Sequence, residues 1–152
     1  MKTIKDHTNK ALKIGKNLSE WSSYSCQPKT NGELKEIIEN RISKEGPKCD
    51  LNDIDTSLIN DMSYLFANKL FNGDISEWNT SNVVNMIGMF YKSNFNGDIY
   101  KWNVSKVRSM GDMFAKSKFN KDISNWKINK SCYTKYMFDG CPIKDEYKPV
   151  LP

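Results

Sequence analysis

The chain contains one histidine, His7, and two arginines, Arg41 and Arg108, among its 152 residues. It has no Cys-x-x-Cys pair, no Gly-x-Ser-x-Gly, no phosphate-binding loop and no dinucleotide-binding fingerprint. A run of about 18 apolar residues is also absent. These absences argue against zinc, against nucleophilic catalysis with a histidine base and against a membrane-spanning helix. We therefore predict no enzymatic activity, no cofactor, no metal and no membrane contact.

The N-terminal segment is basic, and Ala11, Leu12 and Ile14 are too few for the apolar region of a signal peptide. Without an export signal or anchor, we expect a cytoplasmic protein of the host cell or a protein of a virion. Four cysteines allow two disulfides in three pairings, but in that compartment we expect free thiols. They are Cys26, Cys49, Cys132 and Cys141.

A gapless internal repeat of 24 residues organises the chain, as Phe66, Phe90, Phe114 and Phe138 show. Tryptophan, asparagine, aspartate and further apolar positions recur at the same spacing. We call a set of residues at equivalent positions of successive repeats a column. The tryptophan, asparagine and aspartate columns are Trp78, Trp102 and Trp126; Asn72, Asn96 and Asn120; and Asp50, Asp74, Asp98 and Asp122. One repeat holds too few large apolar residues to fold alone, so stacked repeats must cover each other.

Two kinds of periodicity occur within one repeat. Phe71, Gly73 and Ile75 alternate with polar residues, which favours a short strand. The apolar residues of 59–68 have helical spacing and predict a short helix, or a strand entry followed by one helical turn. We therefore predict an α/β repeat solenoid, a leucine-rich-repeat-like stack of about four 24-residue coils, each with a short strand plus a short helix or turn.

The flanking segments divide the chain into three parts. Residues 1–49 form a polar segment with a short helix through Ile14, Leu18 and Trp21 and then a helix that caps the first coil. Thr30 or Asn31 begins this second helix, Gly46-Pro47 ends it, and its apolar residues share one face. They are Leu34, Ile37, Ile38 and Ile42. Residues 50–143 form the repeat, and 144–152 form a tail.

The segments FNGDISEWN, FNGDIYKWN and FNKDISNWK, with the Ser-x-Val-x-x-Met-x-x-Met-Phe pattern between them, carry a family resemblance. They resemble the BspA-like leucine-rich-repeat family, in the subtype of bacterial surface proteins and of phage or viral proteins. The resemblance covers about 50–143. It implies a leucine-rich-repeat fold, a role in adhesion or protein binding, and no catalytic residues.

The repeated polar columns each have a structural and a functional interpretation. The aspartates suggest catalysis or calcium, but an active site needs unique residues, so we favour carboxylates held by backbone N–H groups or by the hydroxyls of Ser57, Ser81 and Ser105. The asparagines are expected to form an amide ladder. The tryptophans suggest a stacking platform, yet we favour corners of the core whose N–H groups bind backbone carbonyls.

Columns that vary between coils are the expected binding surface. Residues 50–79 hold six acids and one lysine, a net charge of −5, and residues 80–135 hold ten basic residues and three acids, a net charge of +7. The basic part predicts a site for an acidic protein partner. Its candidate residues are Lys92, Lys106, Arg108, Lys116 and Lys130.

A protein-binding interaction or inhibitor module, intracellular or phage-encoded, is thus the predicted function. A structural subunit of a virion or other assembly stays open. So does a nucleic-acid-binding accessory that uses the basic coils, although base readout favours arginine and the chain has only two. The sequence does not fix the oligomeric state.

Overall fold

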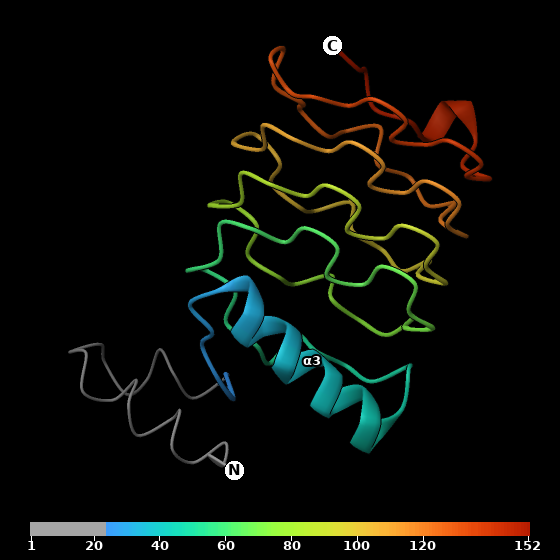
Figure 1. Cartoon of the computed structure of the whole chain (residues 1–152). Helices are drawn as coiled ribbons and strands as arrows, with labels where there is room; N and C mark the ends of the chain where they lie inside the picture. Colours follow the sequence, from blue (N-terminus) through green and yellow to red (C-terminus); the bar gives the residue numbers. More distant parts are fainter. Residues whose placement is uncertain (1–23) are drawn as a thin grey trace.

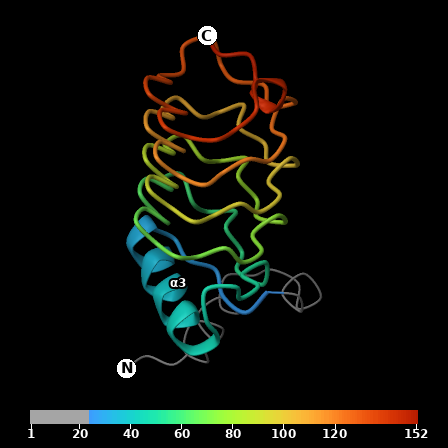
Figure 2. The same ribbon diagram turned by 90° about the vertical axis from the view of Figure 1, so that its right-hand side faces the viewer.

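Backbone pairing between residues 24 positions apart joins successive coils. The computed structural model describes residues 24–152. Parallel bridges link Asp50 to Asp74, and Asp61 to Asn85, Ser109 and Tyr133 in succession. Figures 1 and 2 show these coils stacked along one axis, with a helix at one end and the C-terminus at the other. Each coil therefore rests on its neighbours in the register of the sequence repeat.

Helix α3, Asn31–Glu45, covers the first-coil end of the stack (Figure 1). The Thr30 side chain accepts a hydrogen bond from the backbone N–H of Glu33, and the N–H of Gly46 closes the last turn on the carbonyl of Ile42. Leu34 and Ile38 are buried against the first coil. The spacing of apolar residues thus predicted both the helix and the face that it buries.

The segment 59–68 is not the predicted helix. The backbone N–H groups of Met62, Tyr64, Phe66 and Asn68 donate to carbonyls of the next coil, at 2.8–2.9 Å. Those of Leu65, Ala67 and Lys69 close turns on the carbonyl three residues earlier. Left-handed backbone at Tyr64 (φ 53°) and Asn68 (φ 58°) aims the donors alternately in these two directions. Pairing between coils therefore replaces the i to i−4 bonds of a helix.

The predicted strand at 71–75 is also absent. Phe71 and Ile75 do point into the core, but only Asp74 makes a bridge, to Asp50. Further along the stack the N–H of Asn96 donates to the side-chain oxygen of Asn72, at 2.8 Å, in place of a backbone carbonyl. Because the asparagine amide takes the position of a ladder acceptor, no sheet forms on this side of the coils.

These two differences overturn the predicted fold class. Residues 24–152 contain one α-helix, one short 3₁₀ helix and isolated bridges, and the rest is turns and irregular backbone. The described chain is neither an α/β repeat solenoid nor a leucine-rich repeat. The sequence pattern correctly located the alternating core positions. Backbone N–H groups in these segments, however, donate to carbonyls within turns and to side-chain oxygens as well as to carbonyls of neighbouring coils.

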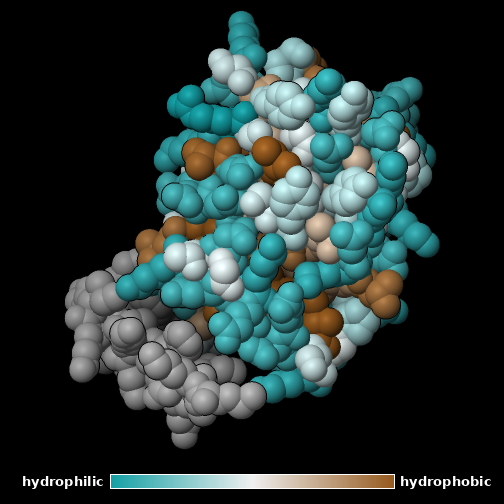
Figure 3. All heavy atoms as spheres, viewed as in Figure 1, coloured by the Kyte–Doolittle hydropathy of each residue, from teal (hydrophilic) through white to brown (hydrophobic). Residues whose placement is uncertain are grey.

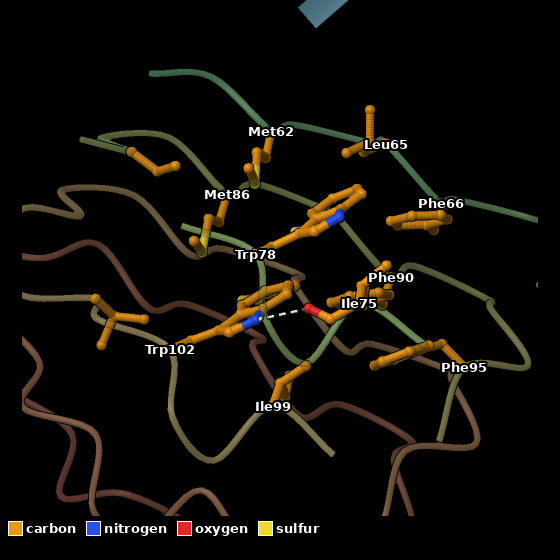
Figure 4. Close-up of a cluster of buried hydrophobic side chains, with 14 of the residues drawn as sticks. Met62, Leu65, Phe66, Ile75, Trp78, Met86, Phe90, Phe95, Ile99 and Trp102 are labelled. Carbon is orange, nitrogen blue, oxygen red and sulfur yellow. Dashed lines mark hydrogen bonds between the residues drawn. The ribbon is translucent and has the colours of Figure 1, made fainter. Parts of the chain in front are cut away.

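Aromatic rings form the centre of the core (Figure 4). The rings of Phe66 and Phe90 stack with centroids 5.6 Å apart, and those of Phe90 and Phe114 are 5.5 Å apart. Phe71, Phe95 and Phe119 form a second parallel column. Burial of these rings removes a large apolar area from water in each coil. The resulting hydrophobic stabilisation holds the coils together although they contain little regular secondary structure.

The tail at 144–152 continues the register of the coils for a short distance. The N–H of Lys144 donates to the side-chain oxygen of Asn120, at 3.1 Å, and the 3₁₀ helix η2, Asp145–Tyr147, follows. The carbonyl of Tyr147 accepts from the N–H of Ile123. His7 and the short helix predicted through Ile14, Leu18 and Trp21 lie outside the described residues.

Candidate protein-binding surface

The tryptophan column is part of the core. The indole N–H of Trp102 donates to the carbonyl of Ile75 in the preceding coil, at 3.1 Å (Figure 4). Trp78 and Trp126 repeat this bond, and neighbouring indoles are stacked 6.4 Å apart. All three side chains are at least 96% buried, with relative exposures of 3–4%. Bases or sugars therefore have no access to these ring faces.

The asparagine and aspartate columns hold the backbone. Asn72, Asn96 and Asn120 each accept a hydrogen bond from the N–H group 24 residues later, at 2.8–3.1 Å. Each aspartate of the column instead accepts from the N–H two residues later in its own coil, at 2.8–2.9 Å. These are Asp50, Asp74, Asp98 and Asp122.

The aspartates are therefore turn-forming groups. The backbone N–H and hydroxyl of Ser76 bind Asp74 and help to hold the pKa of its carboxyl below the ordinary value. Ser124 has the same effect on the pKa of Asp122. Ser57, Ser81 and Ser105 belong to other turns, where their backbone N–H groups bind Asp55, Asn79 and Asn103.

The five basic candidates are all exposed, and they occupy two segments of the repeat. Lys92 and Lys116 end the turn segments 87–92 and 111–116, and both have left-handed backbone, with φ of 51° and 55°. Lys106 and Arg108 precede the segment 111–116, and Lys130 is one coil further along the column of Lys106. The five residues therefore belong to two different segments of the repeat.

Arg108 makes backbone hydrogen bonds with the coils on both sides of it. Its backbone N–H donates to the carbonyl of Val84, and its carbonyl accepts from the N–H of Tyr133, both at 2.9 Å. Val84 and Tyr133 are exposed, and the Arg108 side chain makes no ion pair with any residue of 24–152. We call these residues, with the two lysines beside them, the Arg108 surface: Val84, Lys106, Arg108, Lys130 and Tyr133.

Sequence reasoning missed the exposed tyrosines. The ring of Tyr133 lies over Gly111, where a Cβ would stand 2.5 Å from a ring carbon, and Tyr64 lies over Gly88 in the same way. Tyr133 and Tyr136 are 52% and 59% exposed. The available signal was two variable columns in which tyrosine occurs among small or polar residues: 61, 85, 109, 133, with tyrosine at 133, and 64, 88, 112, 136, with tyrosine at 64 and 136.

A second surface feature is a hollow of about 360 Å³ between α3 and the first coil. Ile42, Pro47 and Leu70 line it, and the ion pair between Lys69 and Glu39 lies at its edge, with a separation of 3.0 Å. Its lining is almost entirely apolar and presents no set of convergent polar groups. The face in Figure 3 is largely hydrophilic, with hydrophobic residues in small separate groups.

The described residues offer no metal centre, since 24–152 contain no group of three or more His, Cys, Asp and Glu residues placed to hold an ion. All four cysteines are free. Burial is the main cause that raises the pKa of Cys26, Cys49 and Cys132, which favours the unreactive thiol form. None of the helices in 24–152 combines the length and the apolar character needed to cross a bilayer.

Comparison with known proteins gives one family. A family model described as "Mycoplasma protein of unknown function, DUF285" matches residues 33–147, which are 115 of the 152 residues. The chain belongs to this family. The DUF285 match begins inside α3 and ends at the last residue of η2, so it spans the helix and the stacked coils together. No curated protein and no solved structure matches the chain.

Proposed function

We propose that the chain is a non-enzymatic protein-binding module and that the Arg108 surface is its binding site. The observation that carries the proposal is the environment of Arg108, whose side chain is exposed and makes no ion pair among residues 24–152, and whose backbone bonds directly to the exposed residues Val84 and Tyr133. Arginine and tyrosine are the residue types that contribute most to protein interfaces. An exposed guanidinium without an ion pair suits a carboxylate on a partner protein.

The lysines beside Arg108 support an acidic partner. Lys106 donates to the side-chain oxygen of Asn82 at 3.3 Å and has no carboxylate partner among the described residues, and Lys130 extends the same column. Positive charge in such a row speeds the association of an acidic surface and weakens with salt. The motif resemblance to BspA-like proteins, which implies protein binding, favours the same class of function.

Comparative capture tests the proposal. The full chain, its Arg108→Glu variant and its Lys121→Glu variant are immobilised separately, and proteins retained from a lysate of the native host are quantified. Both substitutions reverse one exposed positive charge in the same coil, but Lys121 lies outside the Arg108 surface. We expect one acidic protein to be retained by the full chain and by Lys121→Glu and to be lost from Arg108→Glu.

Two results would contradict the proposal. One is equal retention of every protein by the two variants, which would place the site elsewhere. The other is retention that a nuclease abolishes, which would favour binding to nucleic acid. Circular dichroism and melting curves of both variants establish that each is folded, so that a loss of binding reflects the surface and not the stability.

A further inference from the structure

The last coil presents a row of backbone donors that every earlier coil uses for pairing. In each of the first three coils, four alternate N–H groups of the turn segment donate to carbonyls of the next coil, at 2.7–3.0 Å. The corresponding donors in the last coil have no acceptor among residues 24–152. They are the backbone N–H groups of Thr134, Tyr136, Phe138 and Gly140.

These donors are already held in the pairing conformation. Tyr136 and Gly140 have φ of 58° and 62°, the left-handed values found at the same positions of the earlier coils. The turn bonds from Met137, Asp139 and Cys141 to the carbonyls three residues earlier are also formed. The four N–H groups therefore point along the stack without further rearrangement of the backbone.

Apolar side chains are exposed beside the donor row. Phe66, Phe90 and Phe114 are fully buried, whereas Phe138, the last ring of their column, is only partly buried. Tyr136, within the segment, is also exposed. Terminal coils normally need a cap with a polar outer face, because an open end presents apolar surface and unpaired backbone groups.

The two ends of the stack differ in how far the described chain covers them. At the first coil, the side-chain amide of Asn31 in α3 donates to the carbonyls of Asp61 and Ser63, at 3.1 and 3.3 Å. At the last coil, Ile143 is buried, Tyr147 pairs with Ile123, and the Lys148 ammonium of the tail lies 5.9 Å from the centroid of the Phe138 ring. The segment 134–140 keeps its donor row.

We propose that the segment 134–140, the donor edge, binds a segment of a second polypeptide that carries the same coil motif. The occupant must present carbonyls on alternate residues, because the donors alternate. It must also present an aromatic ring at the Phe position of the Met-x-x-Met-Phe spacing, because the rings at this position stack from coil to coil. A coil of this motif meets both requirements.

A folded second copy of this chain does not fit the donor edge. Two last coils facing one another would bring donors against donors. The complementary row of carbonyls is at the first coil, where Asp61 and Ser63 already accept from the Asn31 amide of α3. The occupant is therefore a coil that enters without a capping helix, in a mode that resembles the addition of a strand to an open sheet edge.

A synthetic peptide of residues 104–120 is the probe, added to the ¹⁵N-labelled full chain. Within the chain, the carbonyls of Ser109, Gly111, Met113 and Ala115 in this segment accept the four bonds from the preceding coil. We expect hydrogen exchange at Thr134, Tyr136, Phe138 and Gly140 to slow at least about tenfold at saturation. Exchange at Tyr133, Met137 and Asp139 should stay unchanged, because these N–H groups are already bonded.

A scrambled peptide of the same composition is the matched control, and it should leave all seven amides unchanged. Absence of protection, uniform protection across 133–140 or equal protection by the scrambled peptide would each overturn the proposal. The Arg108→Glu variant should bind the peptide as the full chain does, because Arg108 lies outside the donor edge. This comparison separates failure of the docking edge from failure of the Arg108 surface.

Discussion

The indole Nε1 of Trp102 donates a hydrogen bond to the backbone carbonyl of Ile75, at 3.1 Å, and thereby fastens one coil to the one before it. The residues are 27 positions apart, and Trp78 with Leu51 and Trp126 with Ile99 repeat the separation. A single side chain thus contributes both apolar area and a specific link between neighbouring coils.

Trp102→Ala is expected to destabilise the chain by about 3–5 kcal/mol, since it leaves a cavity in the core and an unpaired carbonyl at Ile75. Lys101→Ala is the control, because Lys101 is exposed and its ion pair with Glu77 lies at the surface. It should change stability by less than about 0.5 kcal/mol. Urea denaturation measures both, and equal shifts in the unfolding midpoint would contradict the packing described above.

Asn96→Ala should cost about 1 kcal/mol, because the substitution removes the oxygen that accepts from the backbone N–H of Asn120, at 2.8 Å. Asn96→Asp keeps an acceptor at the same place and should be nearly neutral at pH 7. Thermal unfolding of the two variants compares them directly. If both lost stability equally, the role of the asparagine column as a set of backbone acceptors would be wrong.

The turn segments end on residues with left-handed backbone, where glycine is favoured. Substitutions to and from glycine in this column should therefore change stability in opposite directions. Lys116 has φ of 55°, so Lys116→Gly should relieve strain and stabilise the chain by about 0.5–1 kcal/mol. Gly140 has φ of 62° in the same column, so Gly140→Ala should destabilise by about 1 kcal/mol. Chemical denaturation detects both changes. Destabilisation by Lys116→Gly would show that the lysine side chain, and not the backbone, governs stability there.

Acid should weaken the attachment of α3 to the first coil. Burial opposes ionisation of Asp53, but its hydrogen bonds with the Arg41 guanidinium, at 2.9 and 3.0 Å, hold the pKa of its carboxyl below the ordinary value. The resulting stability is complete above the unfolded pKa of about 3.9 and is lost as pH falls through the lower folded pKa.

The variant Asp53→Asn isolates this effect, since Asp74 and Asp122 also have lowered pKa values and titrate in the same range. Unfolding free energy measured from pH 6 to pH 2 should fall less steeply for Asp53→Asn than for the unchanged chain. Identical slopes would mean that the bond between Arg41 and Asp53 makes no contribution that depends on protonation.

The sequence predicted the register of the coils but not their secondary structure. Columns such as Phe66, Phe90 and Phe114 identify residues that stack, because an aromatic core position is under the same packing constraint in every coil. The helical spacing of 59–68 was misleading. Its apolar residues face the core through alternating turns, and the left-handed residue Tyr64 belongs to a column that has glycine only at Gly88.

The exposure of the basic residues in the candidate surface was predicted, while its role in binding stays a prediction. Exposure of Lys106 and Arg108 follows from their position in variable columns, and both are exposed in the structure. The left-handed backbone of Lys92 and Lys116 was not predictable, because only the turn segments 87–92 and 111–116 that they end require it. Tyr133 was missed for a similar reason, since its ring is exposed only because it lies over Gly111.

The rate of association with the captured partner tests the central claim most directly. The double variant Lys106→Glu with Lys130→Glu reverses two exposed charges of the Arg108 surface, and Lys121→Glu with Lys127→Glu reverses two exposed charges elsewhere. Stopped-flow measurements at low and at physiological salt should show association slowed about tenfold in the first variant, with a weaker salt dependence, and little change in the second. An unchanged association rate and affinity in the first variant, once shown to be folded, would contradict the account.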